Sequence, residues 1–297
     1  MTSPVLARCG ISHMTTPTLT LGDAARAYAD AGFASTGVWL HKFERPDHVA
    51  GFFIPDAEIP ESAVEQAAQE VRASGLTVSH VIMGGFFITD DEEHRKHRVA
   101  YTAHAMDIAA ALGSSCLIIA PGRLEGRSVD QAHAISARSL TEVLELRPDS
   151  DVLLGIEPVI EWQSDYMSSI DRALELIELV DHPKLGVYPD NFHLWHNAGW
   201  NAAAVIEQIE RAGSRIVGVH VNDGVRASED RYVPGEGEMP VAEFVAAVEA
   251  TGYRGSYDVE YIYDSELITS DPDRFAPEAV VARCRVGLEK TLSGVLA

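Results

Sequence analysis

Four short stretches in the second half of the chain decide the fold: VLLGIEP at 152–158, LGVYPD at 185–190, IVGVHVND at 216–223 and SYDVEY at 256–261. Each is rich in β-branched or aromatic residues and mostly apolar on both faces, as strands covered by helices must be. Each also carries an ionisable side chain at or near its end. The sequence therefore predicts buried parallel strands with polar chemistry at their carboxyl ends.

Four similar stretches precede them, so that eight strands alternate with segments of helical period. They are LARCGIS at 6–12, STGVWL at 35–40, TVSHVIM at 77–83 and CLIIAPG at 116–122. Between strands, apolar residues recur at helical spacing, as at Ile170, Ala173, Leu174 and Ile177, and Ser128 with Gln131 forms a capping-box start. Eight βα units predict a single α/β domain over residues 1–297, a (β/α)8 TIM barrel. An open doubly wound sheet is the alternative, but no Gly-x-Gly-x-x-Gly follows a strand.

Composition limits the classes of partner. The chain has 297 residues, of which 46% are hydrophobic and 23% charged, as in ordinary globular proteins. Its net charge of −22 repels phosphate backbones and anionic lipid heads, so we expect neither a nucleic-acid nor a membrane partner. No apolar run approaches the roughly 18 residues that span a bilayer. Whether the chain forms a homo-oligomer stays open.

The three cysteines, Cys9, Cys116 and Cys284, are an odd number and lie far apart in sequence. They predict reduced thiols in the core rather than a disulfide framework. The amino terminus lacks a basic start followed by an apolar segment, so we expect a cytoplasmic protein.

Strands five to eight end with Glu157, Asp190, His220 and Glu260. In a closed barrel these side chains converge on one mouth, where barrels of this kind place their chemistry. Three carboxylates brought together raise one another's pKa unless a cation joins them. The donor set is oxygen-rich and favours Mn²⁺ or Mg²⁺ over structural zinc. We predict one divalent ion, with Mn²⁺ favoured.

Further polar and aromatic residues lie near the same mouth. His193 follows Asp190 by three positions and could reach a substrate oxygen, or could be a surface histidine. Arg231 precedes YVPGEG in a long loop, where its guanidinium could donate to sugar hydroxyls. His13 and Trp39 fall at or near strand ends, with packing an equal interpretation of Trp39.

Three other features have simpler predicted roles. His80 lies near the end of the third predicted strand and adds to the polar mouth. Asn222 and Asp223 could orient the ring of His220 or the following loop. The charged run EEHRKHR at 92–98 is typical of a solvated helix face.

The order GIEP, PDNFH, GVHVND, RYVPGEG, GYRGSYDVEY, from about residue 150 to 265, resembles the xylose-isomerase-like sugar isomerase and epimerase barrels, and ketose 3-epimerases and inosose isomerases most of all. The resemblance implies that Glu157, Asp190, His220 and Glu260 bind one Mn²⁺, Mg²⁺ or Co²⁺, and that both glutamates exchange protons with the substrate. It also implies that His193 and Arg231 bind substrate oxygens. Gln163 departs from the family, where ketose 3-epimerases carry a further glutamate.

The leading hypothesis is proton transfer next to a carbonyl of a neutral ketose, keto-inositol or related sugar, through an enediolate. The second is elimination of water or an aglycone from a 3-keto sugar by a dehydratase or lyase. The third is an endonuclease at abasic DNA sites, which the charge of −22 opposes. The last is a sugar-binding protein without catalysis.

Overall fold

The computed structural model describes residues 4–49 and 54–295. Its eight strands form one parallel sheet in the order β6-β5-β4-β3-β2-β1-β8-β7. Single parallel bridges, Val187 with Ile216 and Asp190 with His220, then link β6 to β7 and its approach. The predicted TIM barrel is confirmed. The strands are β1 Cys9–Ser12, β2 Ser35–Trp39, β3 Thr77–Gly85, β4 Cys116–Ala120, β5 Leu153–Ile156, β6 Leu185–Val187, β7 Val219–Val221 and β8 Tyr257–Val259.

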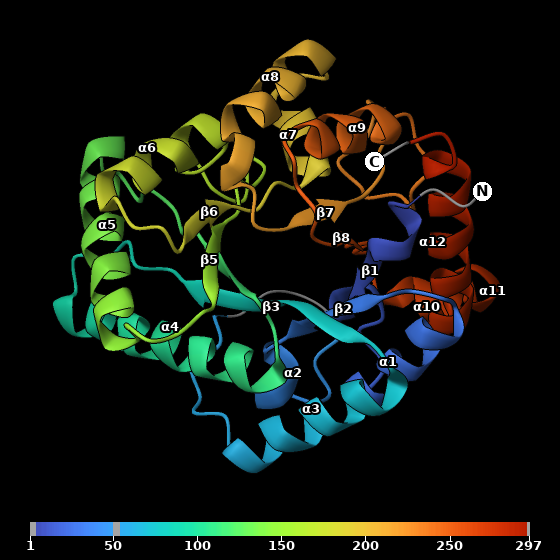
Figure 1. Cartoon of the computed structure of the whole chain (residues 1–297), viewed down its shortest axis with the longest axis horizontal. Helices are drawn as coiled ribbons and strands as arrows, with labels where there is room; N and C mark the ends of the chain where they lie inside the picture. Colours follow the sequence, from blue (N-terminus) through green and yellow to red (C-terminus); the bar gives the residue numbers. More distant parts are fainter. Residues whose placement is uncertain (1–3, 50–53, 296–297) are drawn as a thin grey trace.

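A ring of helices surrounds the strands (Figure 1). Eight of them pack each against the next, and the last returns to the first: α1 Leu21–Asp30, α3 Glu61–Ser74, α4 Glu92–Leu112, α5 Val129–Leu146, α6 Ile170–Val180, α8 Ala202–Ala212, α9 Val241–Ala250 and α12 Pro277–Leu292. The connections carry short helices and 3₁₀ turns: α2 His41–Glu44, α7 Asn191–Asn197, α10 Glu266–Ser270, α11 Pro272–Phe275, η1 Leu6–Arg8, η2 His13–Thr15 and η3 Gly213–Arg215.

Local signals for helices hold in the structure. Ser128 and Gln131 form both hydrogen bonds of a capping box at the start of α5. The stripe at helical spacing in α6 buries Ile170, Ala173 and Ile177 against the barrel, while Leu174 is only partly buried. Helical periodicity thus identified the faces that cover the sheet.

The predicted strands exist, but several are shorter than expected at their ends. The fifth, sixth and eighth strands end before Glu157, Asp190 and Glu260, and of these three Asp190 still forms a single bridge with His220. The first loses Leu6–Arg8 to a 3₁₀ turn. At the mouth the backbone stops pairing with neighbouring strands because it turns into loops and helices. The sequence pattern alone does not show at which residue the pairing ends.

The interior of the barrel has an apolar cluster of its own, separate from the larger core between strands and helices. It comprises Trp39, Ile82, Met83, Cys116, Ile118, Ala120 and Tyr188. All three cysteines are free and buried, as predicted. Within the described residues, no helix has the length and apolar character needed to cross a membrane.

One expectation about α4 is wrong. The run EEHRKHR was predicted to be a solvated face, yet Arg95 and Arg98 are buried. Arg95 binds the carboxylates of Glu92 and Glu142, and Arg98 donates to the carbonyl oxygens of Gly85 and Pro55. Because α4 faces β3 along its length, two of the basic side chains turn inward, where fixed acceptors offset the cost of burying their charge.

Candidate metal centre and active site

Each member of the predicted quartet comes from a different strand or from the residues just after it. Glu157 is the first residue after β5, and Glu260 the first after β8. His220 is the middle residue of β7. Asp190 caps the amino terminus of α7 and accepts a hydrogen bond from the amide of Phe192 at 2.8 Å. The parallel bridge between Asp190 and His220 places these two side by side.

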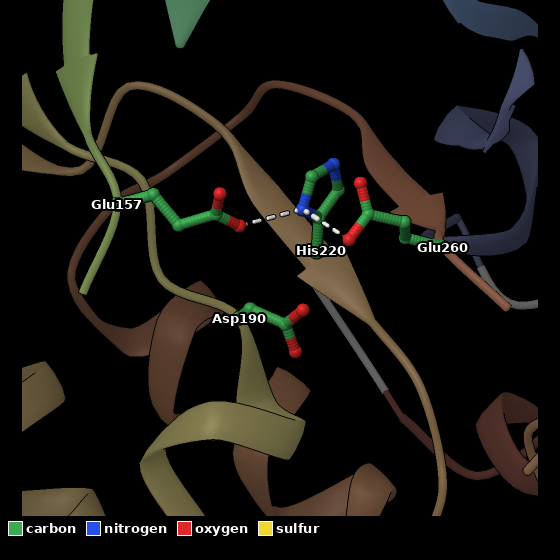
Figure 2. A group of neighbouring side chains, drawn as sticks. All are labelled: Glu157, Asp190, His220 and Glu260. Carbon is green, nitrogen blue, oxygen red and sulfur yellow. Dashed lines mark hydrogen bonds and ion pairs between the residues drawn. The ribbon is translucent and has the colours of Figure 1, made fainter. Parts of the chain in front are cut away.

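The four side chains converge as predicted, with one donor atom from each lying within 4.8 Å of the others. Figure 2 shows Glu157 and Glu260 approaching His220 from opposite sides, with Asp190 beside them. The Nδ1 atom of His220 lies 2.9 Å from Oε1 of Glu157 and 3.6 Å from Oε2 of Glu260. His220 and Asp190 are fully buried, and Glu260 is 5% exposed.

Burial and mutual charge shift the acidity of these groups. Burial raises the pKa of Glu157 to about 7, even though the hydrogen bond to His220 works in the other direction. Burial alone would lower the pKa of His220, but the carboxylates of Glu260 and Glu157 raise it to about 9. Asp190 has a pKa of about 2, because the charges of Arg231 and the neighbouring histidines outweigh burial. Glu157 is therefore able to hold or release a proton near neutral pH.

The structure brings Arg231 and His193 to the quartet. Nη1 of Arg231 lies 2.8 Å from Oε2 of Glu260 and 3.2 Å from Oδ2 of Asp190. Its Nη2 lies 3.0 Å from Nε2 of His193. Nδ1 of His193 accepts the amide hydrogen of Ile160 at 3.1 Å, and burial lowers the pKa of this ring to about 3. The neutral ring therefore carries its hydrogen on Nε2, facing the guanidinium.

Asn222 and Asp223, which were considered as residues that orient the ring of His220, have other partners in the structure. Asn222 donates to both carboxylate oxygens of Asp190 at 3.1 Å, so it orients the aspartate instead of the histidine. Asp223 fixes the loop that carries Arg231: its carboxylate accepts from the amides of Gly224, Met239 and Gly235 at 2.8 to 2.9 Å. The expectation that this pair orients the loop is thus met by Asp223.

The remaining predicted mouth residues lie in separate environments. Trp39 belongs to the apolar cluster inside the barrel, and its ring packs against His41 and His48. His13 is buried, and its Nε2 lies 3.1 Å from the carbonyl oxygen of Leu19. Their substrate-binding roles remain predictions, and the contact with Leu19 does not bring His13 to the quartet.

His80 lies deeper than predicted. It was expected near the mouth, yet it is fully buried inside the barrel, with Nε2 3.2 Å from Nε2 of His220. The sequence signal for this inward position was a glycine in a neighbouring strand, because a strand glycine often marks the close approach of another group. At Gly37 a Cβ atom would lie 2.2 Å from the ring of His80.

The donor set fits a divalent ion. An ion about 2.1 Å from each ligand bridges donors separated by up to about 4 Å. The four atoms lie within 4.8 Å of one another, so small side-chain movements would bring all four to one ion. Arg231 pairs with the carboxylates of Asp190 and Glu260, and His220 pairs with that of Glu157. A cation that displaces the proton of His220 would offset the same negative charge. Glu157, Asp190, His220 and Glu260 are the residues that would hold it.

Comparison with known proteins is consistent with this geometry. The model of the xylose isomerase-like TIM barrel family matches residues 25–283. The chain belongs to this family. Its curated relatives include fructoselysine 3-epimerase of Escherichia coli O157:H7, 25% identical over 193 residues, or 64% of this chain and 67% of that protein. Inosose isomerase of Bacillus subtilis is 25% identical over 183 residues, or 59% of this chain and 64% of that protein.

A dehydratase also occurs among the relatives of this barrel. A segment of 3-dehydroshikimate dehydratase of Pseudomonas putida is 34% identical over 107 residues, which cover 33% of this chain and 16% of that longer protein. Among solved structures, the IOLI protein with a binding zinc atom superposes with a TM-score of 0.78 at 17% identity, over 98% of this chain and 99% of that one. This likeness shows a shared fold. The relatives of this chain thus include epimerases and isomerases, a dehydratase and a probable endonuclease 4 of Oceanobacillus iheyensis.

Proposed function

We propose that this chain is a divalent-metal-dependent sugar isomerase or epimerase that transfers a proton at the carbon next to a carbonyl. Its substrate is a ketose, a keto-inositol or a related neutral sugar. The names of the epimerase and isomerase relatives support this substrate class. The net charge of −22 favours a small neutral molecule over a nucleic acid. The free buried cysteines support a cytoplasmic location.

The observation that carries the proposal is the placement of Glu157 and Glu260 on opposite sides of His220 (Figure 2). Two carboxylates that approach a carbon from opposite faces can remove a proton from one face and return it to the other, which inverts that centre. Transfer between neighbouring carbons would instead give aldose–ketose isomerisation.

Arg231 and His193 supply the donors that would hold substrate oxygens. Nη2 of Arg231 and Nε2 of His193 lie 3.0 Å apart, and with the hydrogen of His193 on Nε2 both groups are donors. Neither can accept the hydrogen of the other, so a shared acceptor is needed. A hydroxyl or carbonyl oxygen of a bound sugar meets that need.

A divalent ion held by the quartet would supply Lewis-acid stabilisation of the charge that develops on the substrate oxygens. We favour Mn²⁺, with Mg²⁺ or Co²⁺ as alternatives, because three carboxylates and one imidazole make a hard donor set.

The test is exchange of solvent deuterium into substrate, measured by NMR over a panel of ketoses, inososes and 3-keto glycosides in D₂O with saturating Mn²⁺. Glu157→Gln and Glu260→Gln should each lower exchange by about 100-fold or more, the usual size of a general acid or base effect. Exposed Glu161 lies in the same loop as Glu157, and Glu161→Gln should exchange like wild type. Undiminished exchange in either active-site variant refutes the assignment.

Elimination is the second candidate, because the segment shared with the dehydratase is 34% identical. The same carbanion next to a carbonyl can expel a hydroxyl or an aglycone instead of being reprotonated. Mass spectrometry of the products distinguishes the two reactions. A product isobaric with the substrate supports isomerisation or epimerisation, and loss of water or an aglycone establishes the lyase.

A further inference from the structure

A column of buried polar side chains runs through the barrel beneath the quartet. It begins at Nε2 of His220, which lies 3.2 Å from Nε2 of His80 on β3. The other ring nitrogen of His80, Nδ1, lies 2.9 Å from the hydroxyl of Tyr188 and 3.1 Å from that of Ser79. The Ser79 hydroxyl in turn donates to Asp258 at 2.8 Å. His80, Asp258 and Tyr188 are all at most 1% exposed.

The backbone around the column is shaped to admit its two central rings. A Cβ atom on Gly37 would lie 2.2 Å from the ring of His80, and one on Gly218 would lie 2.0 Å from the ring of Tyr188. Both glycines lie within or next to strands, where glycine otherwise weakens the sheet. Space for these rings therefore comes at some cost to strand stability.

The direction of the hydrogens along this column decides what His220 can bind. A neutral imidazole has one hydrogen, and a metal ligand nitrogen must be bare. Nδ1 of His220 faces Glu157 and Glu260, so a ligand there requires the hydrogen to lie on Nε2. That hydrogen needs an acceptor, and Nε2 of His80 accepts it only if His80 carries its own hydrogen on Nδ1.

Asp258 favours this direction. Its carboxylate accepts hydrogen bonds from the hydroxyls of Ser79, Ser256 and Ser35 at 2.8, 2.7 and 3.2 Å. Because the Ser79 hydrogen is donated to Asp258, the Ser79 oxygen can accept from Nδ1 of His80 at 3.1 Å, and the Tyr188 hydroxyl oxygen can accept from it at 2.9 Å. The carboxylate itself lies 3.8 Å from this nitrogen, where its negative charge favours a hydrogen on the near side of the ring.

We propose that His80 and Asp258 are positioning residues that fix the tautomer of His220, so that its Nδ1 lone pair faces the quartet and accepts a divalent ion. They act through His220 and do not touch the substrate. The inference rests on the metal site of the proposed function. It adds that metal binding by His220 also depends on Asp258 of β8, whose carboxylate is hydrogen-bonded to three serines.

Calorimetric titration of the folded chain with Mn²⁺ tests the proposal. His80→Phe, which keeps a ring but removes the acceptor, and Asp258→Asn should each weaken Mn²⁺ binding by about 10- to 100-fold, the usual effect of losing a partner of a metal-bound histidine. His80→Gln, whose side-chain oxygen can accept from Nε2 of His220, should recover most of the affinity. Tyr166→Phe, at a fully buried tyrosine outside the column, is the control and should stay within about threefold of wild type.

The wild-type chain provides a readout that needs no variant. In the ¹⁵N-labelled, Mg²⁺-loaded protein, long-range proton–nitrogen NMR should place the hydrogen of His80 on Nδ1 and that of His220 on Nε2. The opposite tautomer of His80, or wild-type Mn²⁺ affinity in both His80→Phe and Asp258→Asn, overturns the inference while the proposed function stands. A wild-type chain that binds no divalent ion overturns both.

Discussion

The strand ends in the two halves of the barrel carry different kinds of side chain. In the second half, each of β5 to β8 delivers one member of the quartet. In the first half, the residues level with the two glutamates are small. Ala120 on β4 is level with Glu157, because the preceding residues Ile119 and Ile156 pair. Ser12 on β1 is level with Glu260, because Ile11 and Val259 pair. β2, β3 and β4 instead supply most of the apolar cluster inside the barrel.

This difference shows how one architecture separates stability from chemistry. Carboxylates confined to one side of the mouth concentrate negative charge where a cation can offset it, and apolar packing on the other side fills the barrel. The column of polar side chains crosses this division, since His80 on β3 contacts His220, and Ser79 on β3 donates to Asp258 on β8. The following predictions test how complete the division is.

The largest effect is expected from Asp190→Asn. The variant keeps the shape of the side chain but removes a charged ligand, so Mn²⁺ affinity should fall by more than about 100-fold, beyond the loss typical of a ligand's own hydrogen-bonding partner. Ser12→Ala, at the level of Glu260 in the first half, should bind Mn²⁺ as wild type does. Equal losses in a calorimetric titration of the two variants would contradict the division between halves.

A smaller effect is expected from Asp223→Asn. An amide cannot accept from Gly235 and also from Gly224 and Met239, so the loop that carries Arg231 should loosen. We expect turnover about 10-fold lower and faster amide hydrogen exchange in the loop, with Mn²⁺ affinity nearly unchanged. Asp230→Asn, on the exposed part of the loop, is the control. Normal turnover in Asp223→Asn would show that the clamp does not position Arg231.

The smallest effect is expected in the first half, from Arg98→Lys. Lysine cannot donate to Gly85 and Pro55 with the geometry of a guanidinium, so unfolding free energy should fall by about 1 kcal/mol with no change in Mn²⁺ affinity. Arg26→Lys, at a largely exposed side chain, should cost under about 0.5 kcal/mol in the same denaturant titration. If Arg98→Lys lost Mn²⁺ affinity, packing in the first half would also determine metal binding in the second, against the proposed division.

Sequence patterns predicted some features better than others for physical reasons. Burial of Arg95 and Arg98 was missed because the charge pattern of α4 says nothing about the acceptors that β3 and α5 bring to it. Asn222 was predicted to orient His220 or the following loop, but it binds Asp190. That partner lies 32 residues away in sequence and comes close only through the pairing of adjacent strands. The convergence of the quartet was predicted because it needs only strand order and strand ends.

The sequence by itself determined the eight strands, the covering helices and the four side chains that meet at the mouth. These follow from local periodicity and from the rule that parallel strands end on one side. Only the tertiary structure decided that Arg231 contacts Glu260, that Asp223 clamps the loop, and that His80 lies under His220. Such contacts depend on which inward-facing residues share a level in the closed barrel, and that register is a property of all eight strands together.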